Sequence, residues 1–255
     1  MDIQTCLREG DLTKAIELAT EVARADPTAI PARAALFELL CFKGDLERAH
    51  KQLDVIAGDS MEKAYGATAL LGLVRAEDQR RAVFRGETQP NFPGDEPAWA
   101  KPRLAYLRGD TAVAAADLEK QRAVVAGTLN GQPFQDLRDG DDLLAPVLEV
   151  FAAGGYAWFD WKRIRKLTAE PPRTLRDTLW FPVALELDSG EVFDAHVPVL
   201  YPGTHECGDE RLMVGLETDW NEEGGGFVRG RGRRILFANG EECDILAVRQ
   251  LETAS

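Results

Sequence analysis

The sequence predicts an α+β protein in which N-terminal tetratricopeptide-like helical repeats are followed by a small mixed or barrel-like β domain. Two observations lead to this fold class. A Gly-Asp pair recurs in the first half of the chain with a period near 34 residues, which is typical of stacked helical hairpins. After Gln132-Pro133 the Ala- and Leu-rich composition gives way to alternating β-branched and aromatic residues, which is typical of strands.

The repeat is marked by Gly10-Asp11, Gly44-Asp45 and Gly109-Asp110, and Asp78 keeps the same spacing without a glycine before it. The successive distances between the four aspartates are 34, 33 and 32 residues. Because the residue that follows a helix often has a positive φ, we expect each glycine to end one helix. Each aspartate of a Gly-Asp pair is then expected to cap the next helix.

A small residue follows each turn at the position where tetratricopeptide helices pack closely: Ala15, Ala49, Ala82 and Ala114. Pro27 fits the position that closes the first unit. The third unit is degenerate, because Ala76-Glu77 stands where the glycine is expected. Stacked hairpins bury their apolar faces only against neighbouring units, so this region favours a protein-binding scaffold over an enzyme.

The last long helix of the repeats is expected over Ala112 to Leu129, before the strong breaker Asn130-Gly131-Gln132-Pro133. This places the domain boundary at the breaker. Residues 1–131 then form a tetratricopeptide-like helical repeat domain, and residues 132–255 form an α+β domain.

Short apolar runs separated by turn residues predict the strands of the second domain. Trp161 to Leu167 is the one segment among them expected as a short helix. Three hairpins are expected: Val147 to Phe151 with Tyr156 to Phe159 around Gly154-Gly155, Pro182 to Leu187 with Val192 to Val199 around Asp188 to Glu191, and Arg234 to Ala238 with Ile245 to Val248 around Asn239-Gly240.

Composition and charge limit the classes of function. The 255 residues, 45% of them apolar, are enough for a sizeable core. The net charge of -13 argues against a nucleic-acid ligand, because phosphate contacts are made largely by Lys and Arg. Basic or amphipathic protein partners are compatible with it.

The N-terminus predicts residence in the cytoplasm and no membrane partner. It lacks the basic start and apolar run of a secretory signal, and no stretch approaches the roughly 20 apolar residues that cross a bilayer. The cysteines Cys6, Cys41, Cys207 and Cys243 are far apart and form no CxxC pair, so neither a disulfide framework nor a zinc site is indicated. No metal and no cofactor are expected.

Two charged runs of the second domain have a functional and a structural interpretation. The acidic stretch with Asp136, Asp139, Asp141 and Asp142 lacks the ligand spacing of an EF-hand, so a solvated face or a helix cap is the preferred interpretation over a Ca²⁺ site. The run from Arg229 to Arg234 resembles RNA-binding segments, but the overall negative charge favours a turn leading into the strand at Ile235.

The alternative function is an enzymatic one, and it depends on His196, His205 and Cys207, which have two acidic residues nearby. They permit a metal-dependent or Cys/His hydrolase that uses the region of His205 and Cys207. The spacing is not specific, since no HExxH motif is present. A non-enzymatic adaptor that binds another protein through its helical repeats is therefore preferred over the hydrolase.

Several motifs resemble the ImpE family, also called TagJ or SciE-type. They are the segment from Phe134 to Leu144, then Val147 to Phe151, Leu175 to Trp180 and Leu200 to His205, in this order. The resemblance covers nearly the whole chain and is most specific between Phe134 and His205. It implies a non-enzymatic accessory protein of the bacterial type VI secretion system. It also implies binding to a helix near the N-terminus of the small sheath subunit TssB, and an indirect connection to the disassembly ATPase ClpV.

The repeats offer a physical route to binding such a helix. Stacked hairpins form a concave surface on which an amphipathic helix can lay its apolar face. In the tetratricopeptide register, the residues expected on this surface are Phe42, Leu71, Val74, Trp99 and Tyr106, with Arg75 and Arg103 beside them to pair with acidic groups. Trp99 is the favoured anchor, because Trp often dominates interface energies. The alternative at each position is a core residue between helices.

Overall fold

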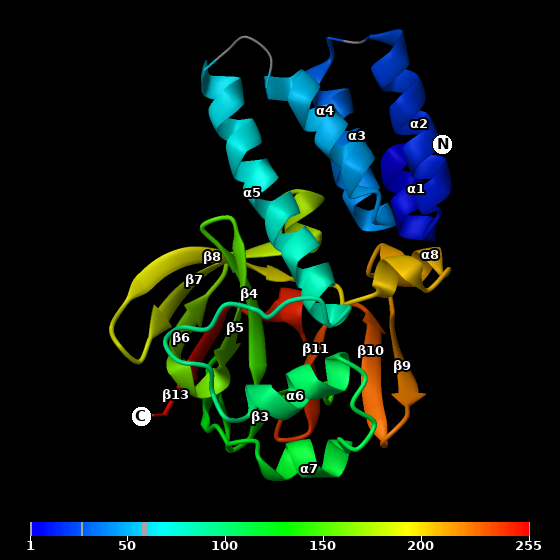
Figure 1. Cartoon of the computed structure of the whole chain (residues 1–255). Coiled ribbons are helices and arrows are strands. Elements are labelled where there is room, and N and C mark those ends of the chain that lie inside the picture. The colour runs from blue at the N-terminus through cyan, green and yellow to red at the C-terminus, as the bar shows by residue number, and fades with distance from the viewer. Residues whose placement is uncertain (1, 27, 58–60, 255) are drawn as a thin grey trace.

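The computed structural model describes residues 2–26, 28–57 and 61–254. Helices of the first third of the chain stand above a β region formed by the rest, and the two ends of the chain lie on opposite sides of the molecule (Figure 1). The predicted α+β class is confirmed. The helices are α1 (Ile3–Glu9), α2 (Leu12–Ala25), α3 (Ile30–Lys43), α4 (Leu46–Ala57), α5 (Met61–Phe84), α6 (Ala100–Leu107), α7 (Ala115–Lys120) and α8 (Glu210–Met213).

Helices α1 to α4 form two hairpins with the predicted turns. Gly10 and Gly44 both have φ of 82° directly after a helix, a conformation that glycine adopts without steric cost. Asp11 caps α2 through the Lys14 amide, and the Asp45 carboxylate accepts the amide of Arg48 at 3.1 Å. Ala15 and Ala49 are fully buried where the helices meet. Pro27, predicted to close the first unit, lies outside the described residues.

The third repeat has no turn, which corrects the expectation at Asp78. Helix α5 continues through Asp78 to Phe84, because Ala76-Glu77 contains no glycine to end the helix. The fourth unit is also different. Gly109 has φ of 90° after α6, but Asp110 accepts the amide of Ala112 in a turn instead of capping a long helix.

The helix predicted over Ala112 to Leu129 is wrong. Helix α7 covers only Ala115–Lys120, and the chain then becomes extended and enters the first strand, Gly127–Leu129. Val124 and Val125 are β-branched and favour the extended backbone. Pairing of Gly127–Leu129 with the last strand of the chain then satisfies the backbone groups of this segment.

The β region consists of antiparallel sheets. One sheet has the strand order β2-β1-β13-β6-β7-β8-β4-β5, a second pairs β12-β11-β3, and a third pairs β10 with β9. The strands are β1 (Gly127–Leu129), β2 (Gln132–Phe134), β3 (Leu137–Asp139), β4 (Val147–Ala152), β5 (Gly155–Asp160), β6 (Ile164–Thr168), β7 (Trp180–Leu187), β8 (Val192–Pro198), β9 (Thr218–Glu223), β10 (Phe227–Gly232), β11 (Ile235–Ala238), β12 (Glu241–Asp244) and β13 (Gln250–Thr253). Single 3₁₀ turns are η1 (Trp161–Arg163), η2 (Arg176–Thr178), η3 (Thr204–Glu206) and η4 (Ile245–Ala247).

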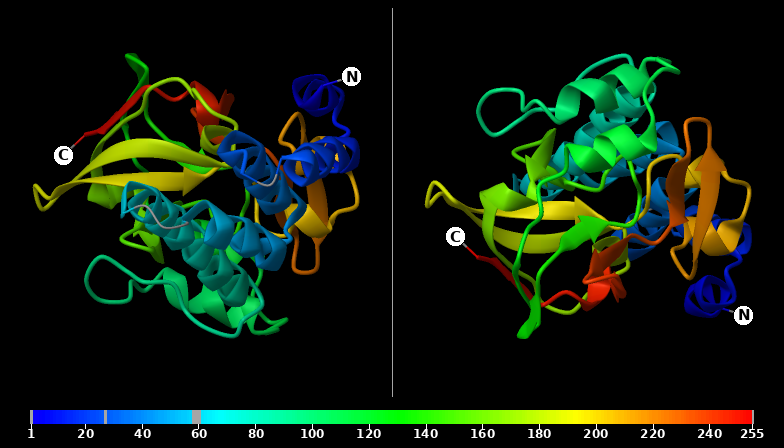
Figure 2. Two further views of the ribbon diagram at one scale, coloured as in Figure 1. Left: turned by 90° about the horizontal axis from the view of Figure 1, so that it is seen from above. Right: turned by 90° about the horizontal axis from the view of Figure 1, so that it is seen from below.

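Two of the predicted hairpins are present as expected, β4–β5 and β7–β8. Seen from above, the β7–β8 hairpin projects away from the helices (Figure 2). Asn239-Gly240 does form a hairpin turn with positive φ at both residues, but the strand after it is Glu241–Asp244, and Ile245–Ala247 is a 3₁₀ turn. Trp161 to Leu167 is likewise one 3₁₀ turn followed by β6, because the buried Ile164 and Leu167 pair with β7.

The predicted domain boundary falls inside a hairpin. Asn130-Gly131 is the turn between β1 and β2, so a division between residues 131 and 132 separates two paired strands. The preceding segment also belongs to the β region by its contacts. Asn91 adds to the edge of β5 by donating its amide to the Tyr156 carbonyl and accepting the amide of Trp158.

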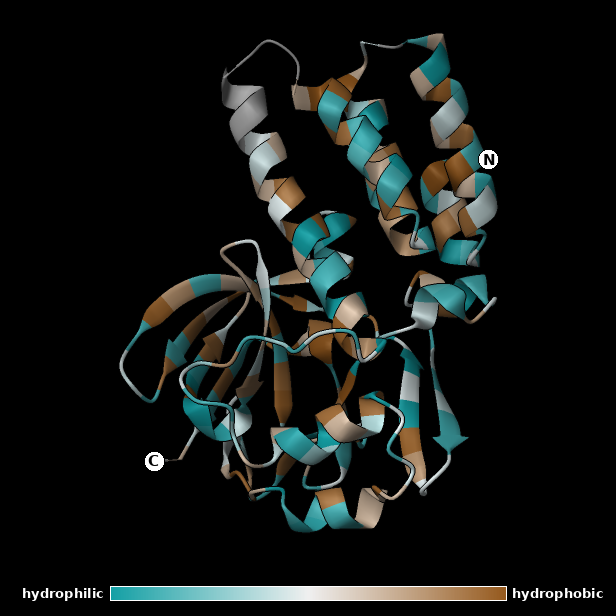
Figure 3. Ribbon diagram, viewed as in Figure 1, coloured by the Kyte–Doolittle hydropathy of each residue, from teal (hydrophilic) through white to brown (hydrophobic). Residues whose placement is uncertain are grey.

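The helices and the β region share one hydrophobic core. Side chains of α1 to α6 are continuous in this core with Phe151, Trp158 and Trp180 of the sheet. Apolar residues accordingly gather where the helices face one another and where α5 meets the strands (Figure 3). Among the described residues, no helix is both long enough and apolar enough to cross a membrane.

Candidate functional site

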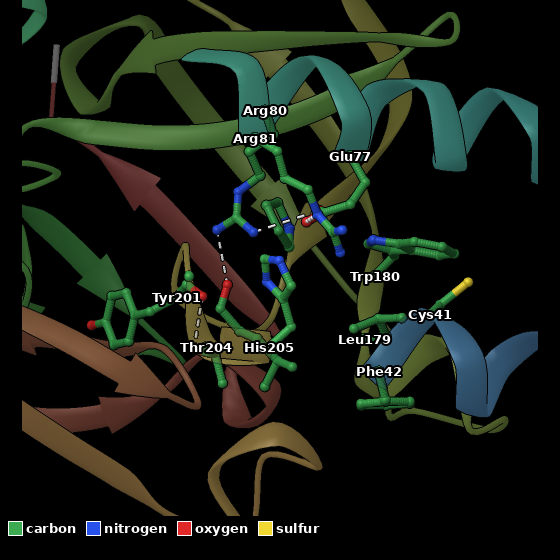
Figure 4. A pocket seen from close by; sticks show the side chains of 13 residues that line it. Cys41, Phe42, Glu77, Arg80, Arg81, Leu179, Trp180, Tyr201, Thr204 and His205 are labelled. Carbon is green, nitrogen blue, oxygen red and sulfur yellow. Dashed lines mark hydrogen bonds and ion pairs between the residues drawn. The ribbon is translucent and has the colours of Figure 1, made fainter. Parts of the chain in front are cut away.

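The helical repeats and the β region meet at a joint that is lined from three sides (Figure 4). Glu77, Arg80 and Arg81 reach down from α5, Cys41 and Phe42 come from the end of α3, and the loop from Leu200 to His205 lies opposite. The free space in this part of the joint is about 20 Å³, which is room for one water molecule. A neighbouring pocket of about 220 Å³ shares Glu77, Arg80, Arg81 and His205 with it.

A buried ionic network holds the joint together. Arg80 of α5 donates two hydrogen bonds to the Glu149 carboxylate, at 2.7 and 2.9 Å, and a third to the carbonyl of Leu200 at 2.8 Å. Arg234 bridges Glu149 to Asp139 and also donates to the Pro198 carbonyl. Because Arg80 comes from the helical repeats and its partners from the β region, the network fixes how the two parts are oriented.

The network shifts the pKa values of its two carboxylates, Glu149 and Asp139, in opposite directions. Burial alone would raise the pKa of Glu149, but Arg80 and Arg234 beside it outweigh burial and lower that pKa to about 2. Burial prevails at Asp139, which pairs with one arginine among the described residues, and raises its pKa to about 6. The Tyr156 hydroxyl donates to Glu149, and Tyr201 donates to Asp139 at 3.0 Å.

The acidic stretch and the arginine run pair with each other, which corrects the interpretation of a solvated face or helix cap. Asp139 and Asp141 are fully buried. Asp139 binds Arg234, while Asp141 accepts from Arg229 at 2.8 Å and from the amide of Gly230 at 3.1 Å. The acidic residues in the segment from Phe134 to Leu144 therefore stabilise the fold through buried ion pairs.

Within the described residues, His205 and Cys207 form no hydrogen bond with each other. His205 lies half-buried against the turn at Gly44, burial lowers its pKa, and its Nε2 is 3.5 Å from a carboxylate oxygen of Glu206. Cys207 contacts the carbonyl of Asp209 through its sulfur at 3.6 Å. Within the described part of the chain, no group of three or more His, Cys, Asp or Glu side chains is arranged to hold a metal ion.

The structure buries four of the residues that were expected on an open binding surface. Phe42 and Val74 lie in the core between the repeats and the β region. Trp99 stacks on Trp158 with ring centroids 6.2 Å apart, and Arg103 donates to the carbonyls of Leu143 and Trp99 with its charge fully enclosed. These positions correct the expectation, because side chains with so little exposed surface offer a partner almost nothing to contact in this conformation.

The reason is that side chains of the β region pack against the helices of the repeats. Trp180 packs against Phe37 of α3, with ring centroids 6.4 Å apart, and Phe151 joins the same core. Tyr106 is also engaged within the chain, since its hydroxyl donates to Glu223 at 2.6 Å and its ring contacts Phe227. Leu71 is half-buried against the core, and Arg75 is exposed.

One open part of the concave surface is a groove of about 830 Å³, which we call the repeat groove. It runs beside α5 above the β4–β5 turn. Its lining residues are Ile30, Ile56, Gly66, Ala67, Thr68, Ala69, Leu70, Gly72, Leu73, Arg75, Phe151, Ala152, Ala153, Gly154, Arg176, Asp194 and His196. Of the predicted partner-binding residues, Arg75 is the one that lines it.

The other groove residues were missed because they come together only in the tertiary structure. Ile30 and Ile56 lie at the ends of neighbouring helices, and Arg176 and His196 come from the β region. The ionic network did leave a signal in the sequence. Glu149 is a single acidic residue within the apolar run of β4, and such a residue must be paired when the strand is buried.

Comparisons with known proteins agree with this architecture. The family model described as ImpE protein matches residues 131–252, and the model described as tetratricopeptide repeat matches residues 7–71. The chain is 32% identical to the type VI secretion system accessory component TagJ of Pseudomonas aeruginosa, over 99% of this chain and 91% of that protein. The crystal structure of protein VPA1032 from Vibrio parahaemolyticus is similar, with a TM-score of 0.90, 26% identity and coverage of 99% of this chain and 97% of the other.

Proposed function

The chain belongs to the ImpE family, and on that premise we propose that it is a non-enzymatic accessory component of a type VI secretion system that acts by binding another protein. The name of the Pseudomonas aeruginosa relative supports the secretion role. The tetratricopeptide repeats support the mode of action, because such repeats commonly present a groove to a partner.

The proposed partner is the small sheath subunit TssB, bound through a helix near its N-terminus in the cytoplasm. Contact with the contractile sheath would connect the protein indirectly to ClpV, in sheath assembly or recycling. The observation that carries the proposal is the repeat groove, which is open, borders α5 and has an apolar floor that includes Leu70, Leu73 and Phe151. An amphipathic helix binds such a groove through apolar residues on one of its faces.

The hydrolase alternative has less support. Its side chains are engaged in local contacts, His205 with Glu206 and Cys207 with the backbone of Asp209. The buried carboxylates of the joint, Asp139 and Glu149, are paired with arginines. A general acid or base must reach the reacting group, which the fully buried Asp139 and Glu149 cannot do.

Calorimetric titration with a synthetic peptide of the N-terminal helix of the cognate TssB tests the proposal. Wild type is expected to bind with roughly micromolar affinity or tighter. Gly66→Leu is the blocking variant, because Gly66 lines the groove and a Cβ there meets no atom within 4 Å. The new side chain should occupy the groove and weaken binding by about tenfold or more, while the stability of α5 is kept or raised.

Glu21→Leu is the matched control. Glu21 is exposed on α2 and does not line the repeat groove, so the same leucine there should leave the affinity unchanged. No binding by wild type would contradict the TssB role. If wild type and Gly66→Leu bound the peptide with equal affinity, the adaptor function would stand, but the peptide would bind outside the repeat groove.

A further inference from the structure

Strand β9 has a free edge. Among the strands that the structure describes, β10 is its one neighbour, and β9 is the outermost strand on its side of the β region (Figure 1). Its six residues, Thr218–Glu223, include neither proline nor glycine. The strand therefore has ordinary length and lacks the residues that usually prevent an edge from pairing.

The backbone groups that face the free edge can be identified from the pairing with β10. In an antiparallel pair, residues directly opposite each other either exchange hydrogen bonds or point their backbone groups away from each other. The amides of Val228 and Gly230 on β10 point away from β9, because they donate to carboxylates of the loop after β3, at 2.7 and 3.1 Å. Opposite them on β9 lie Glu222 and Trp220. The backbone groups of Trp220 and Glu222 therefore point outward, and among the described residues they have no backbone partner beyond the β9–β10 ladder.

Other strand edges of the molecule are covered or short. Strand β5 is as long as β9, but Asn91 pairs with the backbone of Tyr156 and Trp158, and Gln79 accepts the amide of Tyr156. Strand β2 has three residues and contains Pro133. These are common ways to protect an edge, and β9 has neither of them.

The β9–β10 hairpin is held in place by contacts along its length. The carbonyl of Gly225, in the turn, accepts the amide of Ala115 at 3.1 Å. The Trp220 ring packs against Tyr201, with ring centroids 5.7 Å apart. Because the edge is fixed before a partner arrives, little conformational entropy is lost when a strand pairs with it.

The free edge is acidic. Strand β9 carries Asp219, Glu222 and Glu223 and no lysine or arginine. Asp219 and Glu222 are exposed and form no salt bridge within the part of the chain that the structure describes. Glu223 accepts from the Tyr106 hydroxyl, and Arg231 lies across from Asp219 on β10. One cation beside three carboxylates leaves the edge negative.

We propose that β9 binds an extended, basic segment of another protein, which joins the sheet as a third strand. Its backbone pairs with Trp220 and Glu222, and its lysine or arginine side chains pair with Asp219 and Glu222. The charge also disfavours a second copy of this chain, because two paired β9 edges would bring the carboxylates of both copies together. No described residue of β9 lines the repeat groove, so the inference goes beyond the proposed function and does not depend on it.

Titration of the isotope-labelled protein with the acetylated and amidated hexapeptide Thr-Lys-Thr-Thr-Lys-Thr tests the inference. Its lysines have the same spacing as Asp219 and Glu222 in either strand direction, and threonine favours extended backbone. With roughly millimolar peptide, the amide resonances of Trp220 and Glu222 should shift. Hydrogen exchange of these amides should slow by roughly tenfold or more at saturation.

Methylated peptides distinguish strand pairing from attraction between charges. Two versions of the hexapeptide keep the lysines and are methylated on alternate backbone nitrogens, one version for each alternate set. Methyl groups on the nitrogens that face β9 should weaken binding by roughly tenfold or more, because they remove donors of the ladder. The other version should bind like the parent peptide.

Glu222→Pro is the blocking variant, because the N–H that it removes faces the free edge, where a strand tolerates proline. It should weaken binding by roughly tenfold or more. Glu222→Gln removes the charge alone and should weaken binding by roughly two- to fivefold. Gly66→Leu is the control, since Gly66 lines the repeat groove and its substitution should leave this affinity unchanged.

Three results would overturn the inference: unchanged β9 resonances with the parent peptide, equal binding of Thr-Glu-Thr-Thr-Glu-Thr, or equal binding of both methylated versions. If the same resonances shift when the protein alone is concentrated, the edge pairs with a second copy, and a basic partner is wrong. None of these results affects the TssB role, which the titration of the repeat groove decides separately.

Discussion

The indole of Trp99 lies within a row of aromatic and cationic groups that crosses the molecule from α5 to α6. Arg80 lies over the Phe84 ring, Phe84 packs on Trp158, Trp158 stacks on Trp99, and Arg103 lies over the Trp99 ring. Trp99→Ala should therefore lower the free energy of unfolding by about 3 to 5 kcal/mol, as for other large core side chains. Urea denaturation measures this.

Trp99→Phe is the matched variant, because it keeps an aromatic ring beside Trp158 and should lose much less stability. A partner-binding role predicts the opposite pattern, in which Trp99→Ala keeps full stability and loses affinity for the peptide. That pattern would contradict the burial of Trp99, a residue that is 9% exposed.

Asp139 should make stability depend on pH near neutrality. Burial raises its pKa to about 6 in the folded protein, whereas an aspartate in an unfolded chain has a pKa of about 3.9. Between these values the folded state holds a proton that the unfolded state has lost. The stabilising contribution of this group is then complete below about pH 4 and is lost as the pH rises through about 6, by at most about 3 kcal/mol.

Asp139→Asn removes this titration and isolates the effect. The free energy of unfolding of wild type minus that of Asp139→Asn should fall between about pH 4 and pH 6 and level off above. Asp188→Asn is the control for the loss of a carboxylate, since Asp188 forms an exposed pair with Arg163 outside the buried network. A constant difference for Asp139→Asn would mean that Arg234 keeps the carboxylate ionised throughout this range.

Helix α5 is the element whose continuity creates the joint. It carries both the groove residues up to Arg75 and the network residue Arg80, so a break between them would separate the two sites. Asp78→Pro places a proline between Arg75 and Arg80, where it removes a helical hydrogen bond and clashes with the preceding turn. The expected loss is about 3 kcal/mol or more.

Asp78→Ala is the control for the lost carboxylate, and it should keep or slightly raise stability because alanine favours helix. Far-UV circular dichroism and urea denaturation measure both variants. If Asp78→Pro were as stable as wild type, the chain would have the turn at Asp78 that the repeat spacing suggests.

Local sequence determined some elements and not others. Gly10, Gly44 and the residues that cap the following helices act within one turn, so these boundaries were predictable from spacing. The segment after α7 was not, because it becomes a strand only by pairing with β13, more than a hundred residues later. The same limit applies to the site. Arg75 could be assigned from the repeat register, whereas Phe42 and Trp99 are covered by side chains of the distant β region.

At the scale of the whole molecule, the shared core argues against two independently stable domains. The core that contains the residues of α1 to α6 also contains Trp158 and Trp180, and the Arg80–Glu149 pair crosses between the two parts. The full chain should therefore unfold in a single transition, with tryptophan fluorescence and far-UV circular dichroism giving the same midpoint.

A fragment of residues 132–255 tests how far the β region depends on what precedes it. The cut removes β1 from between β2 and β13, and it removes the Trp99 and Arg103 side chains that cover Trp158 and Leu143. The exposed strand edges and apolar surface should make the fragment bind hydrophobic dyes and lose near-UV circular dichroism. A fragment that begins at residue 85 keeps β1 and α6, so it should retain more of the native near-UV signal; equal signals from the two would show that β1 and α6 are dispensable for the sheet.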